Sequence, residues 1–121
     1  MHKTVNVIGE NIMADNNSIE YNKLIRDKIP EIIEAQGKRA VIEVLDADNY
    51  KRYLDLKLGE ELKEYLEADD VEELTDLVEV IYAILDYKAV SREDFKKIRV
   101  SKVQKRGAFK KRILLNRVDL R

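Results

Sequence analysis

Residues 60–79, EELKEYLEADDVEELTDLVE, carry ten acidic side chains and one lysine among the apolar residues of two amphipathic helices. A charge that is buried without a partner costs several kcal/mol. Helices this acidic must direct most of their carboxylates to solvent, and any carboxylate that faces inward must be neutralised. The direction of each carboxylate therefore decides both the fold and the chemistry.

Capping residues and helix stops place three long helices in and around this stretch. Each begins at an Asp or Ser side chain that can accept a hydrogen bond from the first turn of the helix. The predicted helices run from Asp46 or Asp48 to about Ala68, from the Asp69–Asp70 pair to about Lys88, and from Ser91, which forms a capping box with Asp94, to Arg106 before Gly107.

A shorter helix and two apolar runs complete the predicted elements. The helix begins at an Asp27 cap, has Pro30 in its first turn and ends before Gly37. AVIEVL (40–45) is short and β-branched, which is typical of a strand, and GAFKKRILLNRV (107–118) could form a strand that pairs with it. The predicted fold class is all-α: an antiparallel helical bundle with a minor short β element.

Length and periodicity divide the chain into an arm and one domain. Residues 1–19 are Asn-rich with weak periodicity, which predicts a flexible N-terminal arm. Residues 20–121 then form the helical domain. A chain of 121 residues is long enough for one hydrophobic core but not for two.

The composition argues against several classes of protein. No apolar run approaches the roughly 20 residues needed to cross a bilayer. With no cysteine there is no disulfide, no thiolate nucleophile and no cysteine zinc site. The N-terminal stretch lacks the basic start and long apolar run of a signal peptide. We therefore expect a cytoplasmic protein with no membrane partner.

Helical projection at about 100° per residue shows which carboxylates face inward. Glu61 falls inside the apolar arc of the first long helix, and Glu64 lies at its edge. Glu73 falls inside the arc of the second helix, and Asp76 lies at its edge. The arcs consist of Tyr50, Leu54, Leu58, Leu62, Tyr65 and Leu66, and of Leu74, Leu77, Val78, Val80, Ile81, Ile84 and Leu85. A capping box is the alternative for Glu73 alone, and it leaves Glu61 unexplained.

Four converging carboxylates must be solvated, protonated, paired with lysines or bound to a cation, since a domain is stable by only ~5–15 kcal/mol. A bound cation accounts for all four together. The only histidine is His2, so the Glu-x-x-His pattern of di-iron bundles is absent. Ligation by oxygen alone suits Mg²⁺, with Mn²⁺ as the other choice.

The C-terminal third is as basic as residues 60–79 are acidic: residues 96–117 hold ten bases and no acid. Mg²⁺ commonly shares its coordination shell with substrate phosphates. Lys102 and Arg106, four residues apart on one helix, could face one phosphate group together. The alternatives are that this pair is a solvated helix face and that the acidic and basic segments only neutralise each other.

Four motifs occur in order along the chain: YNKLIRDKIPEIIEAQGK (21–38), EELKE (60–64), EELTD (72–76) and KRGAFKKRILL (105–115). Together they resemble the MazG-like, phosphoribosyl-ATP-pyrophosphatase-like family of all-α nucleoside triphosphate pyrophosphohydrolases. The resemblance covers most of the chain. The ExxE…ExxD signature of the family falls on the residues selected by projection, which by resemblance would hold Mg²⁺: Glu61, Glu64, Glu73 and Asp76.

The resemblance implies further roles around this centre. Glu60 and Glu72 would support the site or position water, with Glu60 and Glu61 as the catalytic carboxylates and Glu72 on the side of the substrate. Lys102 and Arg106 match the basic pair that the family carries on its following helix.

The segment YNKLIRDKIP offers Lys23, Arg26 and Lys28 as further contacts to substrate phosphates. The alternative is that Arg26 and Lys28 balance the charge of the acidic helices. The reaction that the resemblance implies is hydrolysis of a phosphoanhydride bond, between the α- and β-phosphates of a nucleotide, in housecleaning of the nucleotide pool. It needs no side-chain nucleophile, which agrees with the absence of cysteine.

Two other classes of function remain open. A catalytically silent helical adaptor could use the same helices for oligomerisation, and a nucleic-acid binder could use the basic tail. Against the second, the tail offers one aromatic residue for stacking, Phe109, and the acidic half would repel a phosphate backbone. Because the apolar arcs are too broad for one chain to cover, we expect a homodimer or homotetramer.

Overall fold

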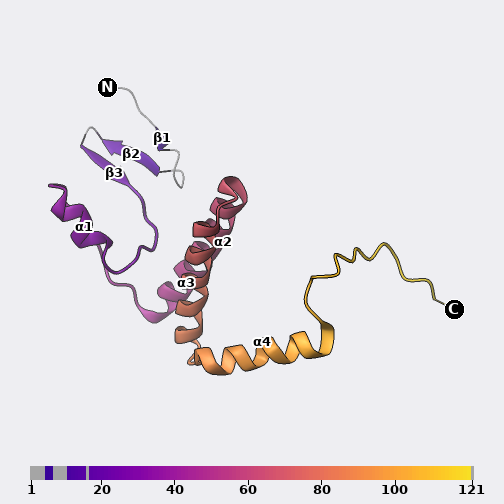
Figure 1. Ribbon diagram of the computed structural model, residues 1–121. Helices are drawn as coiled ribbons and strands as arrows, with labels where there is room; N and C mark the ends of the chain where they lie inside the picture. The colour runs from indigo at the N-terminus through magenta and orange to yellow at the C-terminus, as the bar shows by residue number, and fades with distance from the viewer. Residues whose placement is uncertain (1–4, 7–10, 16, 121) are drawn as a thin grey trace. The chain divides into compact units, whose positions relative to one another are not determined.

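The computed structural model describes residues 5–6, 11–15 and 17–120, and this part of the chain is mostly helical (Figure 1). Its helices are α1 (Ile29–Ala35), α2 (Ala47–Ala68), α3 (Val71–Tyr87) and α4 (Arg92–Arg106). Its strands are β1 (Val5–Asn6), β2 (Asn11–Asp15) and β3 (Ser18–Glu20). The chain divides into two compact units, Met1–Ile84 and Leu85–Arg121.

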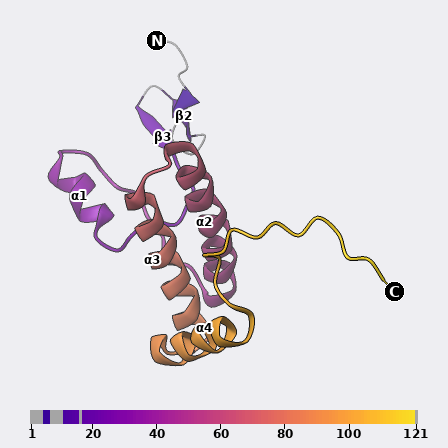
Figure 2. The ribbon, with the colours of Figure 1, turned by 45° about the vertical axis from the view of Figure 1, so that its right-hand side comes forward.

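Helices α2 and α3 form the hairpin that the acidic stretch predicts, and both views show them side by side (Figures 1 and 2). The turn between them is short because two aspartates complete the helix ends. Asp69 adopts a left-handed conformation with φ 52°, and its N–H donates to the Tyr65 carbonyl at 2.7 Å. The Glu72 N–H donates to Asp70 Oδ1 at 3.1 Å, which caps the start of α3.

The predicted caps of α2 and α4 are confirmed. Asp46, rather than Asp48, caps α2, since the Asn49 N–H donates to Asp46 Oδ1 at 2.8 Å. Ser91 caps α4 by accepting from the Asp94 N–H at 3.0 Å. Helix α4 ends before Gly107, whose φ of 85° only glycine adopts without steric strain.

The predicted cap of α1 is wrong. Its N-cap is Lys28, without a side-chain cap, and Pro30 lies in the first turn as expected. The Ile29 N–H donates to the Arg26 carbonyl at 3.1 Å, so a backbone turn already satisfies this donor before the helix begins. Asp27 lies inside that turn, one residue too early to cap the helix.

The predicted pairing of residues 40–45 with residues 107–118 is also wrong. Neither segment is a strand, and Val44 is 93% exposed and Phe109 97% exposed. The error has a physical reason: a β-branched run favours extended backbone, yet a strand exists only where another strand satisfies its hydrogen bonds.

A small antiparallel sheet lies instead near the N-terminus, in the order β1-β2-β3. Val5 pairs with Ile12, and Met13 pairs with Ile19. The register shifts between Met13 and Asp15. The sequence predicts no strand here, because its apolar residues are few and alternate weakly, so the β element exists but at a different place.

The buried core of a single chain is small. Among residues 17–120, the buried apolar side chains are Leu54, Val80 and Leu85, and one acidic residue, Glu61, is buried with them. Several apolar residues of the two long helices stay exposed: Leu56, Leu62, Leu66, Val71, Leu74 and Val78. Association of several copies, which would cover them, stays a prediction. None of the described helices has the length and apolar character needed to cross a membrane.

Candidate metal centre

Glu61 is the acidic side chain that projection places deepest, and the structure confirms its orientation. It lies on α2 two turns after Leu54, which is 1% exposed. Because residues seven apart lie on nearly the same face of a helix, the carboxylate shares the face that buries Leu54. The Glu61 side chain is 8% exposed. A chain that buries few residues thus places a carboxylate among them.

The Glu61 carboxylate has little to neutralise it. Within the described residues its one ion-pair partner is the Lys57 ammonium, with Nζ 3.8 Å from Oε1, which is too far for a hydrogen bond. No fully buried polar side-chain atom in this part of the chain lacks a hydrogen-bond partner. The oxygens of Glu61, which accept none, therefore keep an opening through which a small ion or water can reach them.

Electrostatics oppose the ionisation of Glu61. Burial raises the pKa of its carboxyl first, Lys57 partly offsets the rise, and the charges of Glu64, Asp76 and Glu60 add to it. Asp76 lies on α3, so carboxylates of both helices contribute to the field at Glu61.

The tightest group of carboxylates lies on α2. One oxygen from each of Glu60, Glu61 and Glu64 lies within 4.8 Å of the others. Glu64 lies four residues after Glu60 and three after Glu61, which makes it a neighbour of both on the helix surface. The set differs from the predicted one, since Glu60 joins it while Glu73 and Asp76 stand further out on α3.

Glu73 lies in the first turn of α3. Partial desolvation, followed by the charges of Asp76 and Glu64, raises the pKa of the Glu73 carboxyl. Within the described residues, its carboxylate makes no hydrogen bond to the Asp70 N–H. The capping-box alternative for Glu73 is therefore wrong. The charges of Glu64 and Asp76 act on both Glu61 and Glu73. Each of the four predicted ligands is therefore repelled by at least two of the others.

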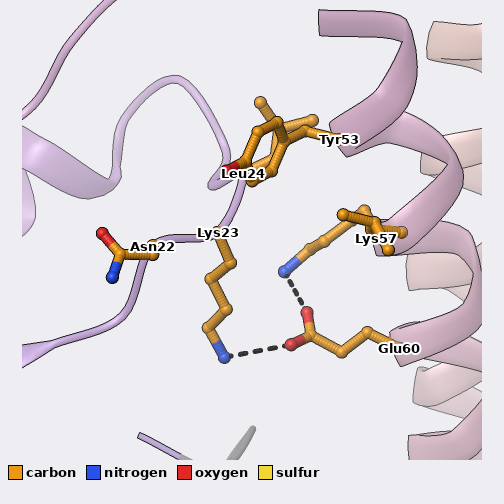
Figure 3. Close-up of a pocket in the computed structure, with 7 residues that line it drawn as sticks. Asn22, Lys23, Leu24, Tyr53, Lys57 and Glu60 are labelled. Carbon is orange, nitrogen blue, oxygen red and sulfur yellow. Dashed lines mark hydrogen bonds and ion pairs between the residues drawn. The ribbon is translucent and has the colours of Figure 1, made fainter. Parts of the chain in front are cut away.

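Two lysines hold Glu60 (Figure 3). Lys57 Nζ donates to Glu60 Oε1 at 2.8 Å, and Lys23 Nζ donates to Oε2 at 3.2 Å. Burial opposes ionisation of Glu60, but the two lysines together outweigh it and lower its pKa. The three side chains border a small pocket of about 70 Å³, with Tyr53 and Leu24 among its apolar walls.

The segment before α1 brings a second cation to the acidic helices. Arg26 Nη2 donates to Asp76 Oδ1 at 2.6 Å. Lys23 and Arg26, which are predicted to contact substrate phosphates, are thus both paired with carboxylates of the centre. For Arg26 this agrees with the alternative that it balances the charge of the acidic helices. Lys28 is exposed at the start of α1, and no ion pair to the acidic group is found for it among the described residues.

The remaining predicted residues lie at exposed positions. Glu72 is in the first turn of α3, beside Glu73. Lys102 and Arg106 lie on α4, in the unit Leu85–Arg121, one turn apart as predicted.

Lys57 is the functional candidate that the sequence reasoning missed. It stands three residues before Glu60 and four before Glu61, which is the spacing of a helical ion pair. That spacing was available in the sequence KLGEE. It gains meaning only once Glu61 is known to be buried, because the same spacing is ordinary on an exposed face.

The donors present fit a hard divalent cation. They are carboxylate oxygens on two neighbouring helices, without sulfur or imidazole, and Mg²⁺ and Mn²⁺ prefer such ligands. The carboxylates repel one another. A cation between them would offset both this repulsion and the energetic cost of burying their charge.

Comparison of the chain with models of protein families, with curated proteins and with solved structures finds no match. The geometry above and the four sequence motifs are therefore what bears on function.

Replacing Glu73 with Gln should stabilise the metal-free protein at neutral pH. The folded-state pKa of Glu73 is raised, so its contribution to stability is present below its pKa in the unfolded chain and is lost as the pH rises through the folded-state pKa. Glutamine carries no charge and avoids this loss. The measurement is the melting temperature in the presence of a chelator.

The matched control is Glu72→Gln, which removes an acid from the same first turn and so loses the same interaction with the helix dipole. We expect Glu73→Gln to melt above Glu72→Gln at neutral pH, with the gap closing near the ordinary glutamate pKa of ~4.3. A melting temperature of Glu73→Gln at or below that of the control at neutral pH would contradict the mutual repulsion.

Proposed function

We propose that the chain is a Mg²⁺-dependent nucleoside triphosphate pyrophosphohydrolase, which cleaves between the α- and β-phosphates and releases pyrophosphate and a nucleoside monophosphate. The observation that carries the proposal is the Glu61 carboxylate: it is buried, it accepts no hydrogen bond from the described residues, and the charges of carboxylates on two helices act on it. A buried charge in such a field is costly unless a cation joins it. The resemblance of the four motifs supplies the reaction.

The carboxylates of the centre would hold the ion: Glu61, Glu64, Glu73 and Asp76. Mg²⁺ bound there supplies charge neutralisation at the phosphate oxygens and acidifies a water molecule. The carboxylates themselves give the ion its position, since each is fixed to a helix whose ends are capped by aspartates.

Glu60 is suited to orient the attacking water. Its lowered pKa keeps it ionised at neutral pH, and a carboxylate accepts hydrogen bonds without donating. Its two lysines fix the direction in which it points. Glu72, which is exposed beside Glu73, would contribute to binding of the substrate.

Lys23 and Arg26 are the cations beside the centre and so support binding of phosphates. Each now neutralises a carboxylate, Glu60 or Asp76. Once a divalent ion supplies that charge, the ammonium and guanidinium groups can turn to substrate oxygens, as charge-assisted donors. Lys28, two residues beyond Arg26, would add a more distant positive charge.

The reaction adds one water across the anhydride. The oxygen of the water forms a bond to phosphorus as the bond to the bridging oxygen breaks, and the leaving phosphate group keeps that oxygen and the electron pair. The proton of the water passes to a carboxylate of the centre and then to solvent.

Replacing Glu61 with Gln should abolish metal-dependent release of pyrophosphate, with a loss of roughly a hundredfold or more, because the deepest ligand of the ion loses its charge. The assay is pyrophosphate release from a panel of nucleoside triphosphates with Mg²⁺ or Mn²⁺. Glu67→Gln, at an exposed position on the same helix, is the control and should keep its activity. Unchanged activity of Glu61→Gln would remove the centre from the reaction, and no release with any nucleotide would overturn the proposal.

Lys102 and Arg106 are proposed to grip the phosphates of the substrate. Replacing either with Ala should remove a charge-assisted bond worth ~1.5–3 kcal/mol, a loss of roughly ten- to a hundredfold in kcat/KM. Lys96 and Lys97 carry equal charge on the first turns of α4 and lie about 9 Å and about 7.5 Å from Lys102 along the helix axis. Their replacement should have a small effect that fades with added salt. If all four variants lost kcat/KM equally, and added salt erased each loss, α4 would act only through its net positive charge and the pair would have no specific role.

A further inference from the structure

Lys57 is the cation placed closest to the buried carboxylate. It lies on α2, one turn before Glu60 and Glu61, and its side chain is 18% exposed. Its Nζ lies 2.8 Å from Glu60 Oε1 and 3.8 Å from Glu61 Oε1. One ammonium group therefore serves two neighbouring carboxylates.

The two contacts of Lys57 differ in kind. The contact to Glu60 is a hydrogen bond, and Lys23 holds the other oxygen of the same carboxylate, so Glu60 is neutralised twice. The contact to Glu61 is longer than a hydrogen bond, yet it is the one ion pair of that carboxylate among the described residues. Lys57 is thus close enough to neutralise Glu61 but does not occupy its lone pairs.

We propose that Lys57 is an internal cation of the metal centre, which neutralises Glu61 while no metal is bound and competes with the metal for that carboxylate. The inference rests on the metal centre of the proposed function, but not on the reaction. A metal ion held by Glu61 would lie close to the ammonium, whose Nζ is 3.8 Å from Glu61 Oε1. Two cations at such separation repel each other strongly where solvent is largely excluded.

The flexible stem of lysine makes this exchange feasible. Its four methylene groups allow the ammonium to move away from Glu61 while keeping its hydrogen bond to Glu60. The Glu61 carboxylate would then be neutralised by the Lys57 ammonium when no metal is bound, and by the divalent ion when it is bound. Loss of Lys57 should therefore have opposite effects on the two states.

The alternative is an ordinary helical ion pair. An exposed i, i+4 pair contributes little to stability and is indifferent to a distant metal. Lys51 and Asp55 form such a pair on the same helix, with Nζ 2.6 Å from Oδ2 and Asp55 largely exposed. Lys51→Gln is therefore the matched control for Lys57→Gln: the same substitution, on the same helix, with the same loss of net charge.

The test combines two measurements on the full chain. Melting in the presence of a chelator gives the stability of the metal-free state, and calorimetric titration with Mn²⁺ gives the affinity of the centre. We expect Lys57→Gln to melt below Lys51→Gln without metal and to bind Mn²⁺ roughly tenfold more tightly than the wild-type chain, because a repelling charge has been removed. Lys51→Gln should bind Mn²⁺ with an affinity near that of the wild-type chain.

Unchanged or weaker binding of Mn²⁺ by Lys57→Gln would overturn the inference, and so would a metal-free melting temperature equal to that of Lys51→Gln. If Lys57→Gln is unfolded without metal, its affinity is obtained from folding induced by Mn²⁺, followed by circular dichroism. Absence of Mn²⁺ binding in all three proteins would overturn this inference together with the metal centre. Binding as expected, with no hydrolysis of any nucleotide, would leave the inference standing and remove only the proposed function.

Discussion

The structure depends on how the chain accommodates the Glu61 carboxylate, which lies on the buried face of α2. Its side chain is largely removed from water, accepts no hydrogen bond from the described residues, and lies in the field of further carboxylates from α2 and α3. Apolar residues at this position would pack at less cost. The hairpin is therefore less stable than it could be at the place where its negative charges are concentrated, and this pattern is typical of functional sites.

The segment before α1 and the two long helices form one electrostatic system. Lys23 reaches Glu60 and Arg26 reaches Asp76, so two side chains from a few residues of irregular backbone neutralise carboxylates on two helices. These pairs offset part of the negative charge of the two helices. If a divalent ion took over that role, as the proposed function requires, the same side chains could turn to the phosphates of a substrate.

The sequence was sufficient at the ends of α2, α3 and α4, where the determining interaction is local, but not at the start of α1, where a backbone turn takes the place of the Asp27 cap. Asp46, Asp70, Ser91 and Gly107 set the helix ends through bonds that span a few residues. Projection at the helical period found the inward direction of Glu61 for the same reason, since one turn of helix fixes it.

The sequence failed where the outcome depends on a distant partner. Residues 40–45 have the composition of a strand, but a strand forms only where another strand pairs with it, and none of the described strands pairs with this segment. The role of Lys57 was missed because its meaning depends on the burial of a neighbour. The pairing of Lys23 with Glu60, 37 residues apart, was likewise beyond local patterns.

The central claim is that carboxylates of α2 and α3 converge on one cation. Anomalous diffraction from crystals of the full chain grown with Mn²⁺ tests it most directly, because the anomalous signal locates the ion without reference to the protein. The account predicts one site in contact with Glu61 and with at least one carboxylate of α3, either Glu73 or Asp76. An ion held only by exposed acids elsewhere, or no ion at saturating Mn²⁺, would contradict it.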